Sequence, residues 1–405
     1  MKTYTNRRRF LKNSALATAG ASLIPGFLKA FERQQLSPAP HEREKILVVV
    51  QLSGGNDGLN TVIPYRNDIY YRSRPNIALP KEKVLNLNGE QGLHPSLLPL
   101  KRLYDQGWLS ILNEVGYPNP DRSHFRSMDI WQTGSSASEY WNTGWLGRYL
   151  DACCQGHPHQ AIDVDDTLSL ALKGKQVKGL AMHDPKKLSR MVQQEHIQTL
   201  TTHYKEKPPH DNTNLHYLYK TLSETVSSAE YLQEKVKKAK SSQDYPQSAF
   251  AKNLQTIAQL INAGASTKVY YTSLSGFDTH VNQDIRQKRM LESYASGIEA
   301  FVKDLQQGGT FEEVLILTFS EFGRRVEENA SKGTDHGTAN NLFVIGKSLK
   351  QAGVYNPAPN LTQLDHGDLI YSIDFREVYA SILEKWLDLP GKQVLGRAFQ
   401  PLNFL

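Results

Sequence analysis

A nearly continuous apolar run that ends in a glycine turn is the feature that most constrains the fold of this chain. Residues 46–52 read Ile-Leu-Val-Val-Val-Gln-Leu, and residues 53–58 read Ser-Gly-Gly-Asn-Asp-Gly. β-branched residues without polar alternation indicate a strand that is buried on both faces, as in the centre of a parallel sheet. The glycines predict a sharp turn directly after that strand.

Similar short apolar runs recur along the chain, at residues 109–112, 268–271, 314–317 and 341–345. Between them lie longer stretches in which apolar residues recur every three or four positions, and these predict helices over residues 285–305 and 375–387. Strands that alternate with helices indicate an α/β fold. We therefore expect one domain over residues 45–405, with a mostly parallel sheet flanked by helices.

Residues 185–262 differ in composition from the rest of this domain. They are rich in Lys, Gln, Ser and Glu and are interrupted by Pro208 and Pro209. The pattern is mainly helical, and we interpret the segment as a helical cap inserted into the α/β core.

The chain contains two cysteines, Cys153 and Cys154, which are adjacent. Neighbouring cysteines rarely form a disulfide, and two are too few for a zinc finger or an iron–sulfur cluster. A chain of 405 residues buries enough surface to need no disulfide scaffold. We therefore expect neither a disulfide nor a cysteine-based metal site.

The first 30 residues have the pattern of an export signal. Residues 6–12 read Asn-Arg-Arg-Arg-Phe-Leu-Lys, and a weakly apolar run follows over residues 15–24. This run is too short to span a bilayer, so we expect a twin-arginine signal peptide rather than a transmembrane anchor. The translocase of that pathway would be a partner during export, a polar linker would follow over residues 31–44, and the mature protein would be periplasmic or secreted.

The net charge of +6 also belongs to this leader. Six of the 47 basic residues lie within residues 1–30, which contain no acidic residue, so the remaining 41 balance the 41 acidic residues of the chain. A domain without excess positive charge is not expected to bind nucleic acid.

Acidic residues and histidines stand next to the ends of the predicted strands. They are Asp57, Asp278, His280, Glu321, Asp335 and His336, with Arg324 beside them. Because ligands bind beyond the carboxyl ends of strands in open α/β sheets, and because carboxylates and imidazoles bind divalent metals, we expect a metal site there. In an extended backbone Asp278 and His280 point to one face and can share an ion. The alternative is an Asp–His hydrogen bond that ties the strand end to the following helix.

Five motifs give a more specific indication, at residues 54–60 (Gly-Gly-Asn-Asp-Gly-Leu-Asn), 122–125 (Arg-Ser-His-Phe), 276–280 (Gly-Phe-Asp-Thr-His), 321–324 (Glu-Phe-Gly-Arg) and 333–337 (Gly-Thr-Asp-His-Gly). In this order they resemble the family known as domain of unknown function 1501. The resemblance extends from about residue 45 to the C-terminus. It implies export by the twin-arginine route and a fold of the alkaline phosphatase and sulfatase superfamily.

That resemblance implies two divalent ions beside a nucleophile at a helix N-terminus. One ion would be held by Asp57, Asp335 and His336, and the other by Asp278 and His280. Zinc, manganese, iron and calcium are not distinguished. Ser123, at the start of a helix predicted over residues 123–133, matches the nucleophile, although serine is also a favoured N-cap.

The chain departs from the superfamily pattern at two points. One residue separates Asp278 from His280, where the superfamily normally has three between its ligands, and the expected late histidine has only His366 as a candidate. No motif for formylglycine formation lies near Ser123. Arg324 is expected to contact the substrate anion or to form a structural ion pair, and Glu321 to bind metal or orient Arg324.

We therefore expect an exported metal-dependent hydrolase of a phosphate or sulfate ester, with a sulfated or phosphorylated glycan as the substrate class considered. The alternative is a non-catalytic exported scaffold or glycan-binding protein that keeps a degenerate phosphatase fold. A redox enzyme is disfavoured, because the sequence has no cysteine cluster, no haem motif and no Gly-x-Gly-x-x-Gly after a strand.

Overall fold

The computed structural model describes residues 44–154, 156–206, 213–238 and 243–405. The predicted signal peptide (1–30) and all but the last residue of the predicted linker (31–44) lie outside these residues. Residues 1–44 and 45–405 form separate units, and the fold described below is that of the second. None of the helices in the described part of the chain combines the length and apolar composition that a membrane span requires.

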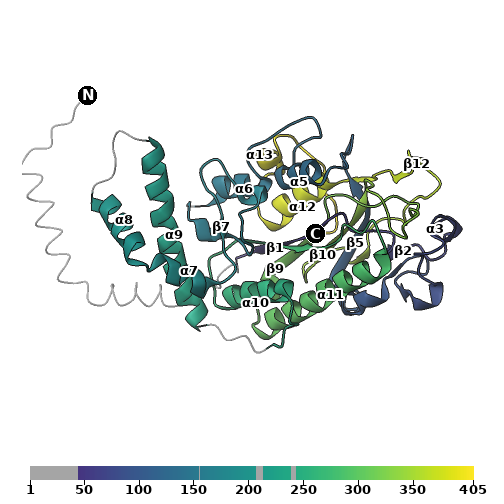
Figure 1. The fold of residues 1–405 in the computed structure, drawn as a ribbon, viewed down its shortest axis with the longest axis horizontal. Helices are drawn as coiled ribbons and strands as arrows, with labels where there is room; N and C mark the ends of the chain where they lie inside the picture. The colour runs from purple at the N-terminus through teal and green to yellow at the C-terminus, as the bar shows by residue number, and fades with distance from the viewer. Residues whose placement is uncertain (1–43, 155, 207–212, 239–242) are drawn as a thin grey trace, which may run out of the picture. The chain divides into compact units, whose positions relative to one another are not determined.

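The central sheet has nine strands among the described residues (Figure 1). They are β1 (Ile46–Ser53), β5 (Leu109–Gly116), β6 (Ala161–Asp163), β7 (Leu180–Ala181), β8 (Val269–Ser275), β9 (Val314–Phe319), β10 (Asn340–Ile345), β11 (Gly353–Val354) and β14 (Ile373–Asp374). The strand order is β11-β5-β10-β9-β1-β8-β6-β7, and β14 also pairs with β5. All pairs are parallel except those of β10, which runs antiparallel to β9 and β5. The expected mostly parallel α/β sheet is thus confirmed.

The first apolar run of the sequence occupies the middle of this sheet. β1 lies between β8 and β9, and seven of its eight residues are buried. A strand with neighbours on both edges and helices on both faces has no solvent-facing side, and this explains why it lacks polar alternation.

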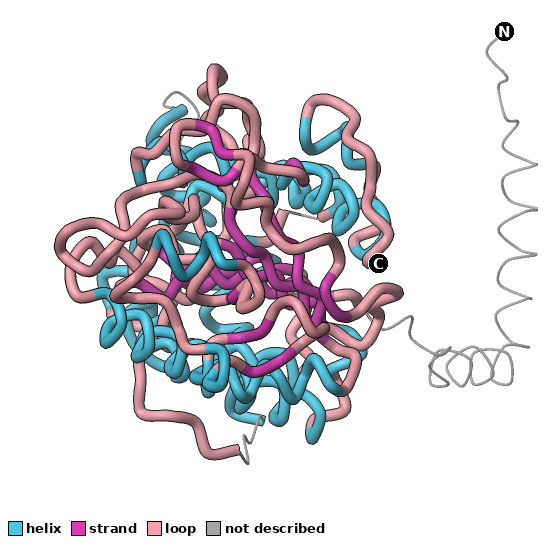
Figure 2. The backbone as a smooth tube through the Cα atoms, turned by 90° about the vertical axis from the view of Figure 1, so that its right-hand side faces the viewer, coloured by secondary structure: helices cyan, strands magenta, loops and turns pink. Residues whose placement is uncertain are grey.

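Helices cover both faces of the sheet (Figure 2). Their bounds are α4 (Leu98–Asp105), α5 (His124–Thr133), α6 (Trp145–Cys153), α7 (Pro185–Val192), α8 (Glu195–Glu206), α9 (Thr213–Lys238), α10 (Ala249–Asn262), α11 (Gln283–Gln307), α12 (Phe375–Ser381) and α13 (Gly391–Leu395). One apolar core lies between the sheet and α4, α10 and α11, and a second lies between the sheet and α5, α6, α12 and α13. The helices predicted over residues 285–305 and 375–387 are α11, and α12 with the π-helix Ile382–Trp386 that continues it.

Smaller elements surround the main sheet. They are α3 (Asp68–Ser73), the three-stranded sheet of β2 (Val62–Ile63), β4 (Gly92–Leu93) and β3 (Leu85–Asn86), and the hairpin of β12 (Leu364–Asp365) and β13 (Asp368–Leu369). The segment 185–262 holds α7 to α10, and α10 packs against β8 and α11 in the core. That this segment is an insertion stays a prediction.

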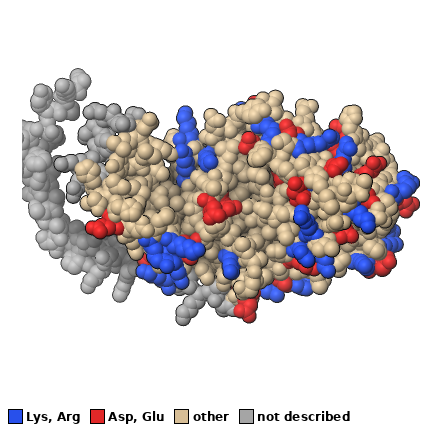
Figure 3. Space-filling view, in the orientation of Figure 1, with Lys and Arg blue, Asp and Glu red and all other residues tan. Residues whose placement is uncertain are grey.

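Two surface features complete the description. On the face drawn in Figure 3, basic and acidic side chains are interspersed, as the charge balance of the domain would lead one to expect. Cys153 and Cys154 are joined in a disulfide between adjacent residues. The expectation that they would not pair was therefore wrong: Cys153 is the last residue of α6, and Cys154, which follows it, has an extended backbone.

Candidate functional site

The chemistry-bearing loops meet at one edge of the central sheet. β5, β8 and β9 end at this edge, and the antiparallel β10 begins there. The residues that follow β5, β8 and β9 therefore lie at the same edge as the residues that precede β10. Asp278 and His280 lie after β8, Glu321 after β9, and Asp335 and His336 before β10. Residues up to 58 positions apart are thereby brought together.

Three donor atoms at this edge form a nearly equilateral triangle. The Nε2 atoms of His280 and His336 are 3.0 Å apart, and they lie 3.1 and 3.2 Å from Oδ1 of Asp278. Nε2 of His124 lies 3.6 Å from the same carboxylate oxygen. The structure thus brings Asp278, His280 and His336 to one point, where the resemblance implied two separate ions.

The second ring nitrogen of each histidine is anchored by an acceptor. Nδ1 of His336 contacts the Arg122 carbonyl at 2.8 Å, and Nδ1 of His280 contacts the Asp335 carboxylate at 3.3 Å. A carbonyl oxygen can only accept, and the contact of Nδ1 with Arg122 is the shortest that the His336 ring makes, so the proton of neutral His336 is assigned to Nδ1 and its Nε2 lone pair faces the triangle. Both nitrogens of His280 face a carboxylate, Asp335 at Nδ1 and Asp278 at Nε2, so its geometry is compatible with either tautomer. Burial also lowers the pKa of His336, which favours this neutral form.

His124 repeats the same arrangement from the opposite side of the site. Its Nδ1 lies 2.9 Å from Oε1 of Glu321, and this hydrogen bond raises the pKa of His124. Its Nε2 is buried and has no hydrogen-bond partner among the described residues. Ligand atoms of His124, Asp278 and His336 all lie within 4.8 Å of one another.

This donor set fits a divalent metal ion. Around a tetrahedral ion with bonds of about 2.0–2.1 Å, neighbouring donors lie about 3.3 Å apart, close to the 3.0–3.2 Å edges of the triangle. The two Nε2 atoms at 3.0 Å are close enough to share a proton or to bind one cation, and without either they would repel each other. Anchored Nδ1 atoms are also the usual feature that orients metal-binding histidines.

Asp278 is ionised over the physiological range. Burial acts to raise the pKa of its carboxyl, but the hydrogen bond and the charge of Arg324, together with the neighbouring His336 and His280 rings, outweigh it, and the pKa falls to about 2. About half of the side chain is exposed. The triangle therefore combines a permanent negative charge with access from solvent.

Glu321 and Arg324 lie beneath the triangle and are buried. Arg324 donates to the backbone carbonyls of Gly55, Thr334 and Phe277 and to Oδ1 of Asp278, at 2.6, 2.8, 3.1 and 2.8 Å. It thus ties the turn after β1 to both ligand-bearing loops, and it does not offer its guanidinium to an anion in solution. Glu321 orients His124 rather than Arg324, and it also accepts the N–H of Gly54 at 2.8 Å.

Two glycines permit these loops to approach one another. Gly54 has a φ of +118°, and a Cβ built there would lie 2.4 Å from the backbone nitrogen of Asp278. A Cβ on Gly333 would lie 2.2 Å from the carbonyl of His280. A larger residue at either position would push a ligand-bearing loop away from the site.

Asp57 and His366 are not brought into the cluster. The carboxylate of Asp57 is 1% exposed and lies 2.5 Å from Nη1 of Arg74 and from Nε2 of Gln283. The imidazole of His366 is 90% exposed, and its described ionic contact is with the neighbouring Asp365 at 3.8 Å. Asp57, which the resemblance assigned to one ion together with Asp335 and His336, is therefore paired elsewhere, and His366, the candidate for the late histidine, lies in solvent.

Ser123 is the N-cap residue of α5 and is exposed. Its hydroxyl makes no capping hydrogen bond, while its N–H donates to Oδ1 of Asp121 at 2.7 Å. The capping role considered for its side chain is therefore not observed. The hydroxyl lies on the residue directly before His124, at the N-terminus of a helix.

Sequence reasoning missed His124. The motif Arg-Ser-His-Phe at residues 122–125 contained the signal, because a histidine follows the serine that drew attention. The apolar run 109–112 predicted the strand β5, which ends at Gly116. Because His124 lies several residues beyond that end, the sequence did not indicate that it reaches the sheet edge where the other candidate ligands lie.

Comparisons with known proteins agree with this picture at the level of family. A family model described as protein of unknown function (DUF1501) matches residues 110–383, while no curated protein matches the chain. Similar solved structures include a phosphonate monoester hydrolase from Silicibacter pomeroyi, at 8% identity over 88% of this chain and 78% of that chain, with a TM-score of 0.41. They also include a sulfatase from Pseudoalteromonas sp., at 13% identity over 92% of this chain and 74% of that chain, with a TM-score of 0.40. A protein in the alkaline phosphatase superfamily from Vibrio parahaemolyticus is also similar, at 9% identity over 76% of this chain and 61% of that chain, with a TM-score of 0.35. These likenesses are too distant to assign an activity.

Proposed function

Since the chain belongs to the family of proteins of unknown function (DUF1501), its activity has to be inferred from its own residues, and we propose that it is a metal-dependent hydrolase of phosphate or sulfate esters. The observation that supports this most is the convergence of Asp278 Oδ1, His280 Nε2 and His336 Nε2 at the open edge of the sheet. His124 is the proposed fourth ligand. A divalent ion held there would polarise an ester oxygen and lower the pKa of a bound water.

The proposed centre holds one ion rather than two. The two Asp–His pairs of the sequence share a single point, and Asp57 is paired with Arg74. Imidazole nitrogens with a carboxylate oxygen favour zinc, manganese or iron over calcium, which prefers oxygen ligands alone.

Ser123 is the proposed nucleophile. Its exposed hydroxyl has no capping bond and lies next to His124 in the chain, so it can attack the phosphorus or sulfur atom while the bond to the alcohol breaks. The proton that serine loses would be balanced by the one that the leaving alcohol takes up, and water would then hydrolyse the seryl ester. A water molecule that attacks in its place is the alternative, and the serine variant below separates the two.

Two other arginines take the anion-binding role expected of Arg324. Arg122 pairs with the buried carboxylate of Asp368, and Nε of Arg325 lies 3.5 Å from the same carboxylate. Two guanidinium groups on one carboxylate leave an excess positive charge, and both side chains are partly exposed. Each is also linked to the site through its backbone, since the Arg122 carbonyl contacts His336 and the Arg325 N–H donates to the Asp335 carbonyl at 3.0 Å. We assign them to attract and orient the anionic ester.

The proposal is tested with p-nitrophenyl phosphate and p-nitrophenyl sulfate, using protein purified without chelator. Hydrolysis of at least one ester is expected, with loss on chelation and recovery when a divalent ion is added. Ser123→Ala should abolish turnover if serine is the nucleophile and retain it if water attacks. A metal-loaded protein that hydrolyses neither ester would contradict the proposed function.

A further inference from the structure

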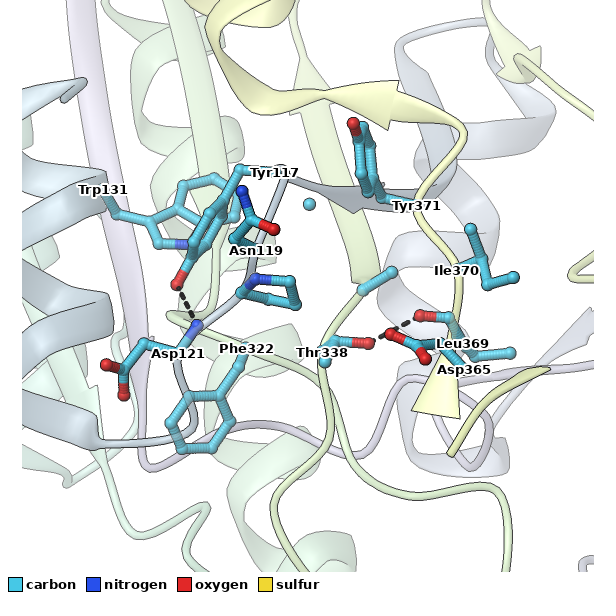
Figure 4. Close-up of a pocket in the computed structure, with 13 residues that line it drawn as sticks. Tyr117, Asn119, Asp121, Trp131, Phe322, Thr338, Asp365, Leu369, Ile370 and Tyr371 are labelled. Carbon is cyan, nitrogen blue, oxygen red and sulfur yellow. Dashed lines mark hydrogen bonds between the residues drawn. The ribbon is translucent and has the colours of Figure 1, made fainter. Parts of the chain in front are cut away.

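A cavity of about 120 Å³ lies beside the proposed metal site. The end of β5, the loop that leads to α5, the start of β10 and the β12–β13 hairpin contribute its walls. Figure 4 shows Tyr117 and Trp131 on one side of it and Ile370 and Tyr371 on the other. The neighbouring cluster around Asp278 is not part of its lining.

The cavity and the metal site share a wall. Phe322 lines the cavity, and its ring centroid lies 4.8 Å from that of His124 and 4.7 Å from that of His336. Asp121, another lining residue, accepts the N–H of Ser123. A molecule in the cavity is therefore one aromatic ring away from the proposed ligands and next to the loop that carries the proposed nucleophile.

The lining excludes an anionic group. It includes the carboxylate of Asp365 and, among the described residues, no Lys, Arg or His, while the carboxylate of Asp121 points away from the cavity (Figure 4). A phosphate or sulfate in the cavity would meet a like charge without a compensating cation. The charged part of the ester thus belongs at the metal site, and the cavity is left for the uncharged part.

The remaining chemistry matches a hydroxylated ring. Tyr117, Trp131, Phe322 and Tyr371 supply aromatic surface, and the carboxylate of Asp365 can accept hydrogen bonds from hydroxyl groups. The indole N–H of Trp131, which is 2% exposed, has no hydrogen-bond partner among the described residues.

We propose that this cavity is a subsite for one neutral pyranose ring, the alcohol part of the ester that is cleaved at the metal site. The assignment rests on the proposed hydrolase function for the link to catalysis, but the binding of the sugar itself does not require the metal.

The test uses methyl pyranosides of glucose, galactose, mannose and N-acetylglucosamine, which carry no phosphate or sulfate. Saturation-transfer NMR and calorimetric titration would be run on the full chain with and without chelator. We expect at least one glycoside to bind equally in both conditions, and to bind at least tenfold more weakly to Tyr371→Ala and to Asp365→Asn. Asp365→Asn keeps the shape of a side chain that is 64% exposed, so it guards against a folding defect in Tyr371→Ala. Tyr140→Ala is the matched control, because Tyr140 is 77% exposed and does not line the cavity. This variant should bind the glycoside with the affinity of the wild type.

The subsite is rejected if no glycoside binds, if both cavity variants bind as the wild type does, or if choline binds in place of the glycosides. The proposed hydrolase function is judged separately on the p-nitrophenyl esters. Glycoside binding by a protein that hydrolyses neither ester would keep the subsite and remove the hydrolase. Hydrolysis of an ester without glycoside binding would keep the hydrolase function and reject the subsite.

Discussion

Oε1 of Glu321 lies 2.9 Å from Nδ1 of His124, and the same oxygen accepts the N–H of Gly54 at 2.8 Å. One buried carboxylate atom therefore orients a candidate metal ligand and holds the turn that follows the central strand. This atom therefore connects the central sheet to the proposed site. The turn that it holds can approach Asp278 only because residue 54 is a glycine.

Glu321→Gln should weaken metal binding while the protein stays folded. The amide oxygen can still accept a hydrogen bond, but the negative charge that increases the basicity of His124 is lost. We expect the metal dissociation constant to rise about 10–100-fold, measured by competition with a chromogenic chelator. Glu327→Gln, at an exposed glutamate, is the control and should bind as the wild type does. Equal affinities for the two variants would show that Glu321 does not act on a ligand.

Asp57→Asn should lower stability and leave the metal content unchanged. The substitution leaves the guanidinium of Arg74, which is 0% exposed, without its ionic partner. Breaking such a buried pair should lower the free energy of unfolding by about 3–5 kcal/mol in urea denaturation. Asp388→Asn removes an exposed pair with Lys45 and should cost at most about 1 kcal/mol. Loss of metal from Asp57→Asn would instead restore the role that the family resemblance implied.

Asp163→Asn should remove a pH dependence of stability. Burial raises the pKa of Asp163 to about 6, with a further rise from Asp165, while the hydrogen bond from Ser169 and the charge of His183 act to lower it. Because the folded state holds this proton more tightly than the unfolded state, stability should fall as the pH rises from about 4 to about 6 and then level off. The amide does not titrate, so the variant should gain about 2–3 kcal/mol relative to the wild type at pH 8. Denaturant titrations of the wild type and the variant at several pH values test whether stability falls as the pH rises, and Asp129→Asn, at an exposed aspartate, is the control. If Asp163→Asn is no more stable than the wild type at pH 8, the raised pKa of Asp163 is contradicted.

Replacing Arg7 and Arg8 together with lysine should keep the protein in the cytoplasm, because the twin-arginine route is proposed to read these residues. Cell fractionation is the measurement, and Arg9 requires its own variant because it can supply a pair in a shifted register. Unchanged export of the lysine pair, combined with arrest when the general secretory route is blocked, would show that the export assignment is wrong.

The strands and the ligand types could be predicted from the sequence because both are local signals. Buried strands produce short apolar runs, and the runs that begin at Ile46 and Val314 identify the centre of the sheet. The direction of β10 could not be predicted, since an apolar run does not record which way a strand runs.

The partners of the site residues depend on contacts between distant segments. Asp57 resembled a ligand until the fold placed Arg74 against it, and Arg324 resembled an anion-binding residue until the fold surrounded it with carbonyls. The number of metal sites followed the same rule. The family resemblance implied two ions, but the loops bring Asp278, His280 and His336 to one point.

The metal content of the purified protein tests the central claim most directly. Elemental analysis of the wild type, exported and purified without chelator, should find about one divalent ion per chain. His336→Ala should lose that ion while its far-UV circular dichroism stays native, and His366→Ala, at an exposed histidine outside the cluster, should retain it. Equal metal content in the wild type and His336→Ala would contradict the proposed centre.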